Sequence, residues 1–430
     1  MATTTAQHGC PMADIPRDFD PFAEDYLRDP YPSLRELRER EPVFYSPRLD
    51  YWVISRYDDV QEGFLNQDDY SASIALDTIV PPYPSSIEIM RRYAFEPGLA
   101  LVNEDPPLHH TRRKRFARSF SPQRMKAMEP FIRELANRYI DRFVKRGEAD
   151  LVGEMVFELP ALVVFKLFGI PDEDVEEVKA YAGELALFNW GLPDEGEQNR
   201  LVEMVCRYRE YGRKHIAYIR EHPGEDMVSD LLAANAEDPE LFPEEYILSS
   251  LPNFLYAGHE TTTSQSGNAF RILLEHREQW GRICGDPSLA GNAVEECLRA
   301  VSSVIAWRRK TKRALTVRGV DIPAGANVLI YSGAANHDAA VFDDPEAFDI
   351  DRDNAKRHLS FGYGAHLCLG APLARVELKV MIEELSRRLP HLELVEGQPW
   401  TYSANTSFRG PKRLLVRWDP SRNPLPADRT

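Results

Sequence analysis

The sequence predicts a mainly α-helical protein with small β-sheets at one side, an α+β fold, and two observations lead to this prediction. From about Pro122 to Trp280, apolar residues recur at helical spacing in one segment after another. Short runs rich in β-branched and aromatic residues occur near both ends of the chain instead. Because no Gly/Ser linker or internal repeat interrupts the chain, we expect one domain over residues 1–430, with flexible tails at about 1–14 and 421–430.

The elements alternate in type at the start and are helical in the middle. Residues 30–42 are expected to form a helix that ends at Pro42, and residues 43–47 and 51–57 a β-hairpin. Helical spacing then defines the segments 57–66, 123–147, 150–170, 172–188, 200–223 and 243–280. Strands return after Trp307, with a hairpin over 313–331 around the turn at 323–325 and short strands at 391–395 and 413–418.

Composition excludes several classes of protein. The net charge is -16, which argues against nucleic-acid binding because a phosphate-binding face must be basic. No apolar run reaches the roughly 18 residues of a membrane span, and the N-terminus lacks the pattern of a signal peptide. The five cysteines are irregularly spaced and odd in number, which favours a reducing compartment. We therefore expect a cytoplasmic monomer that binds neither nucleic acid nor membrane.

One short stretch, FGYGAHLCLG at residues 361–370, carries the strongest chemical signal. Cys368 precedes a helix expected to begin near Ala371, where free N–H groups and the helix dipole stabilise a thiolate. Gly364 and Gly370 remove Cβ atoms, so a flat partner can approach the backbone. A thiolate presented in this way suits the axial ligation of a haem iron. The alternative is a buried structural cysteine, but five fixed positions match by chance on the order of once in ten thousand such chains.

The stretch resembles the haem-binding loop of the cytochrome P-450 family of haem-thiolate monooxygenases, and the resemblance runs in order from about Phe19 to Trp418. It implies haem b as cofactor and Cys368 as the metal ligand. The segments DPFAEDYLRDPYP, SVIAWRR and SFRGP are most similar to bacterial haem domains fused to a reductase with FMN and a [2Fe-2S] cluster. Because this chain has no such cluster motif and no nucleotide-binding glycine motif, we expect electrons from a separate ferredoxin or flavin-type partner or a reductase domain.

The resemblance assigns roles around the haem, residue by residue. In AGHETT, Ala257 and Gly258 leave room above the haem, and Glu260 and Thr261 are the acid and the alcohol that manage protons; a solvated glutamate and back-bonded threonines are the alternative. Pro252 is expected to kink this helix. The cofactor-binding set is completed by His109, Arg113, Arg308, Phe361, Gly364, His366 and Gly370, of which His109, Arg113, Arg308 and His366 meet the propionates. Surplus cations beside His109 are expected to face an acidic redox partner.

Glu296 and Arg299 stand three residues apart on one helical face. Such pairs are usually surface decoration, but the resemblance implies a buried structural lock with Arg352 as its third member. It also implies a substrate wall, for which we select Ile74, Phe188, Ala257, Ile305, Ala306 and Phe408 within the wider set 74–80, Trp190 and 406–408. The family often has Pro where this chain has Ser303, so the turn there is left open.

These roles predict a monooxygenase that inserts one oxygen atom of O2 into a small or medium apolar or aromatic compound, by hydroxylation or oxidative dealkylation. Two alternatives stay open. A peroxide-driven peroxygenase keeps the haem but needs no reductase, and the retained Glu260–Thr261 pair argues against it. A non-catalytic haem sensor predicts no turnover with any electron source.

Overall fold

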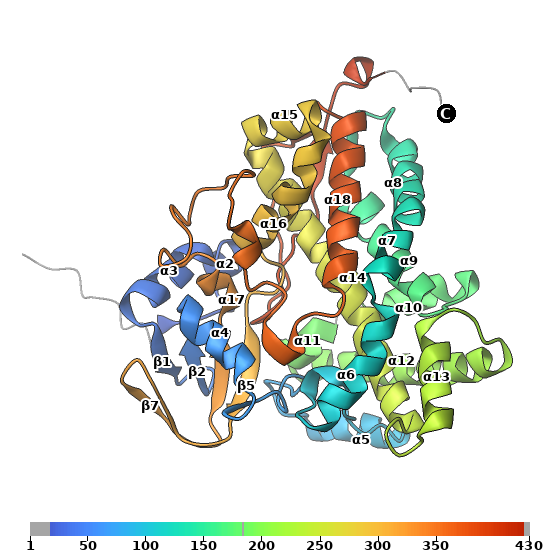
Figure 1. Ribbon diagram of the computed structural model, residues 1–430, viewed down its shortest axis with the longest axis vertical. Coiled ribbons are helices and arrows are strands. Elements are labelled where there is room, and N and C mark those ends of the chain that lie inside the picture. Colours follow the sequence, from blue (N-terminus) through green and yellow to red (C-terminus); the bar gives the residue numbers. More distant parts are fainter. Residues whose placement is uncertain (1–17, 183–184, 425–430) are drawn as a thin grey trace, which may run out of the picture.

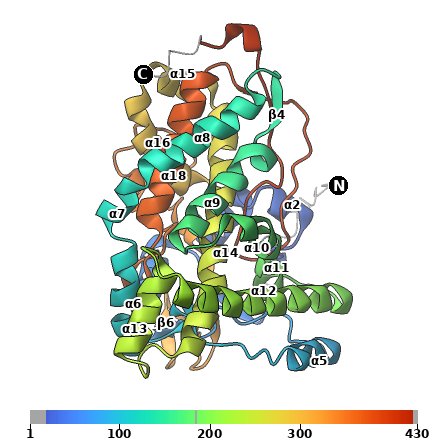
Figure 2. The same ribbon diagram turned by 90° about the vertical axis from the view of Figure 1, so that its right-hand side faces the viewer.

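Helix α14 (Glu244–Glu275) runs through the middle of the helical part of the protein in the computed structural model, which describes residues 18–182 and 185–424 (Figures 1 and 2). Two glutamates in its first turn complement the helix dipole. The helix continues through Pro252 as one element. The expected tail at 1–14 lies outside the described residues, as does the 425–430 part of the tail expected at 421–430. The first residues of that second tail belong to a 3-10 turn over Pro420–Arg422.

Helices surround α14, which confirms the predicted fold class. Their bounds are α2 Glu24–Arg28, α3 Tyr31–Arg40, α4 Tyr57–Leu65, α5 Pro84–Arg92, α6 Leu108–Ser119, α7 Pro122–Ala127, α8 Glu129–Phe143, α9 Glu158–Leu167, α10 Val175–Ala182, α11 Leu185–Trp190, α12 Glu195–Glu221, α13 Met227–Glu237, α15 Arg277–Gly285, α16 Ala290–Ala300, α17 Ser332–Ala335 and α18 Ala371–Arg388. Several predicted segments divide in two. The segment 123–147 breaks at Met128, next to Pro130, and 243–280 breaks at His276.

The strands form small sheets beside the helices. The largest sheet lies at the left of Figure 1. Their bounds are β1 Val43–Ser46, β2 Tyr51–Ile54, β3 Tyr70–Ser71, β4 Glu148–Asp150, β5 Trp307–Thr311, β6 Leu315–Val317, β7 Val320–Ile322, β8 Asn327–Ile330, β9 Glu393–Leu394 and β10 Leu415–Arg417. The largest sheet has the order β1-β2-β8-β5-β3, and the others are β4-β10-β9 and β6-β7. The predicted hairpin of β1 and β2 is present, with Val43 opposite Ile54.

The hairpin predicted around residues 323–325 is wrong in its turn. The chain reverses at Arg318 and Gly319, between β6 and β7. Both residues have positive φ, 48° and 81°, which is what a two-residue hairpin turn of the primed type requires. The Pro-Ala-Gly segment instead connects β7 to β8, which belongs to the largest sheet. Gly319 was therefore the relevant turn signal.

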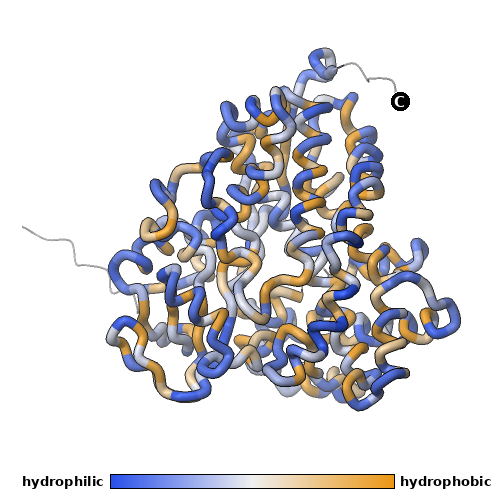
Figure 3. The backbone as a smooth tube through the Cα atoms, in the orientation of Figure 1, coloured by the Kyte–Doolittle hydropathy of each residue, from blue (hydrophilic) through white to orange (hydrophobic). Residues whose placement is uncertain are grey.

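The main hydrophobic core lies among α8, α9, α14, α16 and α18. Fully buried members include Ile140, Leu159, Leu273, Cys297 and Leu385. Figure 3 shows hydrophilic residues concentrated on outer turns of the peripheral helices and hydrophobic residues toward the middle. Helix α18 packs directly on α14 and on α16. This packing fixes the segment that carries the cysteine loop. Across residues 18–182 and 185–424, none of the helices has the length and hydropathy that crossing a membrane would require.

Candidate active site

A largely apolar cavity lies where α14, α18, α6, β5 and the cysteine loop meet. Helix α14 supplies one wall, and the loop with the first turns of α18 supplies another. The side chains that line it include Leu76, Leu101, Arg113, Val164, Trp190, Phe254, Tyr256, Ala257, Gly258, Thr261, Thr262, Gln265, Val304, Trp307, Arg309, Phe361, Gly362, His366, Cys368, Gly370, Leu373, Glu377 and Phe408.

Cys368 presents its side chain to this cavity and is free of any disulfide. Its own N–H donates to the carbonyl of Phe361 at 2.9 Å, which closes the loop in front of α18. Burial raises the pKa of the thiol, while the N–H groups of Gly370 and Ala371 and the charge of Arg113 act in the opposite direction. The thiol therefore sits at a helix N-terminus, as predicted, beside a cation.

Of the loop glycines Gly364 and Gly370, Gly364 has a different function from the one expected for it. Gly364 does not line the cavity; it has φ of 70°, and a Cβ there would lie 3.1 Å from Cα of Leu65 and 3.2 Å from the carbonyl O of Phe64. It therefore permits a left-handed turn packed on α4, and the prediction that it contacts the cofactor is corrected. Gly370 does line the cavity, and a Cβ there would lie 3.8 Å from the sulfur of Cys368.

Two histidines stack beside the loop. The rings of His109 and His366 have centroids 3.9 Å apart and an interplanar angle of 24°. Burial lowers the pKa of both histidines, and so do the nearby charges of Arg113 and Arg309. The pKa is about 2 for His366 and about 4 for His109. Both rings are therefore neutral. Among the described residues, Nε2 of His366 and both ring nitrogens of His109 have no hydrogen-bond partner, although His109 lies behind His366 and does not itself line the cavity.

Arg309, and not the predicted Arg308, lines the cavity from β5. Successive residues of a strand point to opposite faces, so a one-residue error in alignment reverses the direction of the side chain. Arg308 is fully buried on the other face, where its Nη2 donates to the carbonyl of Ala75 at 2.9 Å. Burial lowers the pKa of Arg309 to about 10, so it remains a cation at neutral pH. With Arg113, which donates to the carbonyl of Leu367, it forms the cationic edge of the cavity.

Helix α14 presents Ala257 and Thr261 to the cavity. The Thr261 hydroxyl donates to the carbonyl of Ala257, one turn earlier, at 2.5 Å. Gly258 also borders the cavity, but a Cβ there would lie 2.5 Å from Cγ2 of Val164, so this glycine lets α9 pack closely on α14. The predicted room above a flat ligand therefore comes from Ala257, while Gly258 has a packing function.

Glu260 does not line the cavity, in contrast to its neighbour Thr261. Its Oε1 accepts a hydrogen bond from the Ser264 hydroxyl at 3.2 Å. Burial raises the pKa of Glu260 to about 7, and the Ser264 bond and the charge of Lys412 oppose that rise. A carboxyl with this pKa exchanges protons readily near neutral pH.

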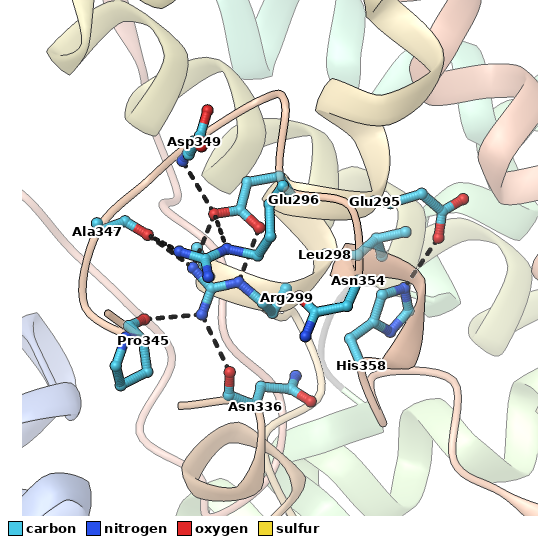
Figure 4. A network of polar contacts seen from close by, with 12 residues as sticks. Glu295, Glu296, Leu298, Arg299, Asn336, Pro345, Ala347, Asp349, Asn354 and His358 are labelled. Atoms are coloured by element: carbon cyan, nitrogen blue, oxygen red, sulfur yellow. Dashed lines mark hydrogen bonds and ion pairs between the residues drawn. The ribbon is translucent and has the colours of Figure 1, made fainter. Parts of the chain in front are cut away.

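The residues Glu296, Arg299 and Arg352 meet in a buried cluster. Figure 4 shows Glu296 and Arg299 at its centre. Arg299 pairs with both carboxylate oxygens of Glu296, at 2.7 and 2.8 Å, and Arg352 Nε lies 3.2 Å from Oε1. The remaining N–H groups of Arg299 donate to the carbonyls of Asn336, Pro345 and Ala347, so the buried charges are paired and their donors used. The cluster ties α16 to the chain that precedes the cysteine loop.

A second carboxylate, Glu295, is a functional candidate that the sequence reasoning missed. It accepts hydrogen bonds from His358 at 3.2 Å and from Arg375 at 2.7 and 3.0 Å, and Figure 4 shows it beside the first cluster. The guanidinium of Arg375 also lies 4.7 Å over the ring of Phe361. Glu295 thus joins α16, α18 and the start of the cysteine loop. An adjacent acidic pair, Glu295–Glu296, was the only sequence signal for it.

Of the six residues selected for the substrate wall, Ala257 and Phe408 line the cavity and four do not. Ile74, Phe188, Ile305 and Ala306 are buried in the core outside the lining. Leu76 and Trp190, which belong to the wider predicted set, do line the cavity, and so do Val304 and Trp307, which were not selected. Ile305 packs instead against Gly333, where a Cβ would lie 2.8 Å from Ile305 Cβ. Residues 305 and 306 lie outside β5 and both face away from the cavity, so strand alternation could not have identified Val304 and Trp307 together as lining residues.

Ser303 resolves the local turn that the sequence left open. Its N–H donates to Oε1 of Gln265 at 2.8 Å, and both side chains are buried. A proline at this position has no N–H to donate. Gln265 also donates to the carbonyls of Cys297 and Val301, at 3.3 Å each. Gln265 of α14 therefore anchors the segment that brings Val304 and Trp307 to the cavity.

Glu377 of α18 is a second residue that the sequence reasoning missed. It is buried and lines the cavity, burial raises the pKa of its carboxyl, and within the described residues its Oε2 has no hydrogen-bond partner. A protonated, uncharged glutamate fits this apolar wall. Nothing in the helical pattern of residues 371–388 separates it from Glu383 and Glu384 of the same helix, which pair with Arg133.

The donor set of the cavity fits a haem. The thiol of Cys368 at a helix N-terminus matches the axial ligand of a haem iron. The cations Arg113 and Arg309 and the unpartnered Nε2 of His366, at one edge of the cavity, match the partners that two haem carboxylates require. The small Ala257 on the opposing helix leaves room for a flat macrocycle. Fold and site together define the class of haem-thiolate proteins.

Comparison with known proteins agrees with this class. Residues 288–413 match the family model described as Cytochrome P450. Cytochrome P450 107B1 of Saccharopolyspora erythraea is 34% identical over 405 residues, which cover 92% of this chain and 96% of the relative. The Tepidiphilus thermophilus P450 heme domain is 41% identical with a TM-score of 0.92, covering 95% of this chain and 99% of that structure. The chain belongs to the cytochrome P450 family, whose members are haem-thiolate monooxygenases.

A larger structure is also similar. An intact type IV self-sufficient cytochrome P450 monooxygenase is 43% identical with a TM-score of 0.93, covering 99% of this chain but 56% of that structure. The present chain thus spans little more than half the length of that enzyme.

Proposed function

We propose that this protein binds haem b through Cys368 and inserts one atom of O2 into a neutral aromatic substrate. The observation that carries the proposal is that a single cavity is lined by a thiol from the cysteine loop, a hydroxyl from α14 and a cluster of aromatic rings. The haem, when bound, supplies the oxygen chemistry. The cavity residues bind and orient the substrate and manage protons.

Arg309, Arg113 and the neutral His366 hold the haem carboxylates in this proposal. The two guanidinium groups form charge-assisted hydrogen bonds with them, and His366 donates from a ring N–H. His109 supports His366 from behind through the 3.9 Å stack. Arg308 acts at a distance from this edge and keeps the segment around Ala75 in place.

Proton transfer is assigned to Glu260 and Thr261. Thr261 reaches the cavity, and Glu260 is adjacent to it on the other side of the helix. Because burial raises the pKa of Glu260 to about 7, the carboxyl can both accept and donate a proton near neutral pH. Thr261 then passes protons into a cavity from which the apolar lining excludes most water.

The substrate class follows from four rings. Trp190 and Phe408 have centroids 4.6 Å apart, and Trp307 lies 6.5 Å from Trp190 at 90° and 6.1 Å from Phe408. Tyr256 lies 5.9 Å from Phe408. Aromatic pairs in edge-to-face and tilted geometry contribute about 0.5–1.5 kcal/mol each beyond area burial. The cationic lining residues, Arg113 and Arg309, come from α6 and β5 and lie outside the aromatic cluster. The cluster therefore favours a neutral aryl compound for hydroxylation or dealkylation.

The electron donor is proposed to dock over the cysteine loop. Leu65, Leu108, Tyr363 and Leu367 expose 52%, 46%, 42% and 44% of their surface there. On α6 the exposed side chains include His110, Lys114 and Arg118. An apolar centre with cations beside it suits an acidic iron–sulfur or flavin protein, because steering by opposite charges speeds association.

The test is oxygen incorporation. The purified holoprotein, an added ferredoxin and its reductase, and an alkylbenzene, whose hydroxylated product retains the inserted oxygen atom, are incubated under ¹⁸O2. The proposal predicts one labelled oxygen atom per product molecule, with turnover that falls as salt rises. Faster turnover with hydrogen peroxide than with the reductase would favour a peroxygenase. Absence of product with either source would contradict the proposal.

A further inference from the structure

Glu260 faces the C-terminal loop 409–412 rather than the cavity. Ser264 follows it by one helical turn, and its hydroxyl donates to Oε1 of Glu260 at 3.2 Å. Ser264 is buried. The adjacent Thr261 is directed into the cavity. Thr261 therefore faces the cavity, whereas Glu260 faces a different environment. That environment includes the loop 409–412, which lies near the C-terminal end of the chain.

The loop 409–412 is fastened to α14 directly beyond Glu260. The Asn268 side chain donates to the carbonyl of Arg409 at 2.9 Å. A Cβ on Gly410 would lie 2.4 Å from Oγ of Ser264, so glycine is required for this approach. Pro411 lies against Gly267, where a Cβ would come within 3.1 Å of the proline ring. Three successive loop residues thus cover the helix at the turn that holds Ser264.

The loop also carries a cation. Lys412 is exposed, and its backbone N–H donates to the carbonyl of Thr401 at 2.9 Å. Two titratable side chains among the described residues interact electrostatically with Glu260. One is Lys412 of the loop, and the other is Tyr256, one turn earlier on α14. Tyr256 is buried and uncharged at neutral pH because burial raises its pKa. Lys412 is therefore the cation that favours the ionised form of Glu260, and the Ser264 hydroxyl is the hydrogen-bond donor to Glu260.

We propose that the loop 409–412 forms the outer end of the proton path to the active site, with Ser264 as a positioning residue that orients Glu260 and Lys412 as the cation that promotes proton release from it. A proton arriving from solvent beside Lys412 binds the Glu260 carboxylate, and the carboxyl then passes it to the Thr261 side of α14. Phe408, which lines the cavity, directly precedes this loop, so substrate contact and proton supply are adjacent in the chain. The inference rests on the proposed monooxygenase function for the role of Glu260.

The first experiment follows the Glu260 carboxyl by infrared spectroscopy of the holoprotein as a function of pH, with the band assigned by its loss in Glu260→Gln. Removing the cation in Lys412→Met should move the midpoint up by roughly half a pH unit, because the ionised form loses its attraction. Ser264→Ala should shift it in the same direction. Arg413→Met is the matched control, because Arg413 is the next exposed cation and pairs with Asp150 at 2.9 Å. An unchanged midpoint in both Lys412→Met and Ser264→Ala would overturn the inference.

The second experiment measures product formed per electron consumed, and the solvent isotope effect on turnover, at several pH values. Ser264→Ala should lower the product yield by about tenfold, in line with the loss of a hydrogen bond to a charged group, and increase the isotope effect. Lys412→Met should shift the pH profile upward without changing substrate affinity. Wild-type yield and isotope effect in both variants would overturn the inference. Failure of the proposed function is distinguishable, because it would appear as absence of product in the wild type.

Discussion

Arg308 and Arg309 are adjacent in β5, yet Arg309 lines the cavity while Arg308 donates to the carbonyl of Ala75 on the other face of the strand. Haem retention should therefore depend on Arg309. We expect Arg309→Leu to weaken haem binding by about tenfold or more, since a charge-assisted hydrogen bond to a carboxylate is lost. The measurement is haem transfer to apomyoglobin. Arg309→Lys, which keeps the charge, should recover part of the retention, and wild-type retention in Arg309→Leu would contradict the assignment.

Removing one partner of the buried pair Glu296–Arg299 should destabilise the fold strongly. Both side chains are fully buried, so Glu296→Gln leaves an unpaired guanidinium in the core and should cost about 3–5 kcal/mol of unfolding free energy. Urea unfolding of the holoprotein measures this. The exposed pair Arg282–Asp351 provides the control, and Asp351→Asn should change stability by less than about 1 kcal/mol. Equal effects in the two variants would contradict a structural role for Glu296.

Stability in acid should depend on Glu295. Burial alone would raise the pKa of this carboxyl, but hydrogen bonds from His358 and Arg375 outweigh it and hold the pKa at about 2, against 4.5 for an ordinary glutamate. The folded state therefore binds the proton more weakly than the unfolded state, and the stabilisation is present above about pH 4.5 and is lost as pH falls toward 2.

The linkage amounts to as much as about 3 kcal/mol at neutral pH. Unfolding free energy measured from pH 6 down to pH 3 should fall less steeply in Glu295→Gln than in the wild type. Identical slopes in the two proteins would show that Glu295 is not ionised in the folded state in this range.

Thr261 should govern how electrons are used. Thr261→Ala removes the hydroxyl that reaches the cavity, so electron consumption should continue while product falls by about tenfold or more and hydrogen peroxide accumulates. Thr263→Ala is the control on the same helix, because the Thr263 hydroxyl donates to the carbonyl of Val156. A product yield in Thr261→Ala equal to that of Thr263→Ala would remove Thr261 from the proton path.

The aromatic cluster should discriminate flat from saturated rings. We expect an alkylbenzene to bind more tightly than the matched alkylcyclohexane, and Phe408→Leu to reduce this preference by about three- to tenfold. Spectral titration of the haem absorption with each compound gives the two dissociation constants. Ile305→Val, a core substitution outside the cavity, should leave the preference unchanged, and equal binding of the two compounds to the wild type would contradict the substrate class.

The sequence sufficed for the fold class, the position of Cys368 before α18, and the contacts of Glu296 with Arg299 and Arg352, because these depend on periodicity or on local motifs with fixed spacing. The stack of His109 on His366 was not predicted. It was wrong at Arg308, where the strand directs Arg309 to the cavity instead. It was also wrong at Ile305 and Ala306, which lie in the irregular segment before β5, while Val304 and Trp307 on either side line the cavity. One residue of register reverses a side chain, and β5 is too short and too cationic for its pattern to define its faces. Glu377 and Gln265 were not found because their environments exist only after α14, α16 and α18 pack together.

The central claim is that Cys368 ligates the haem iron as a thiolate, and the absorption spectrum of the reduced protein with carbon monoxide tests it most directly. Wild type should show a strongly red-shifted Soret band that is absent in Cys368→Ser, while Cys297→Ser, a change at a buried cysteine of the core, should keep it. A Soret band in wild type at the unshifted position, or one that survives in Cys368→Ser, would contradict the account.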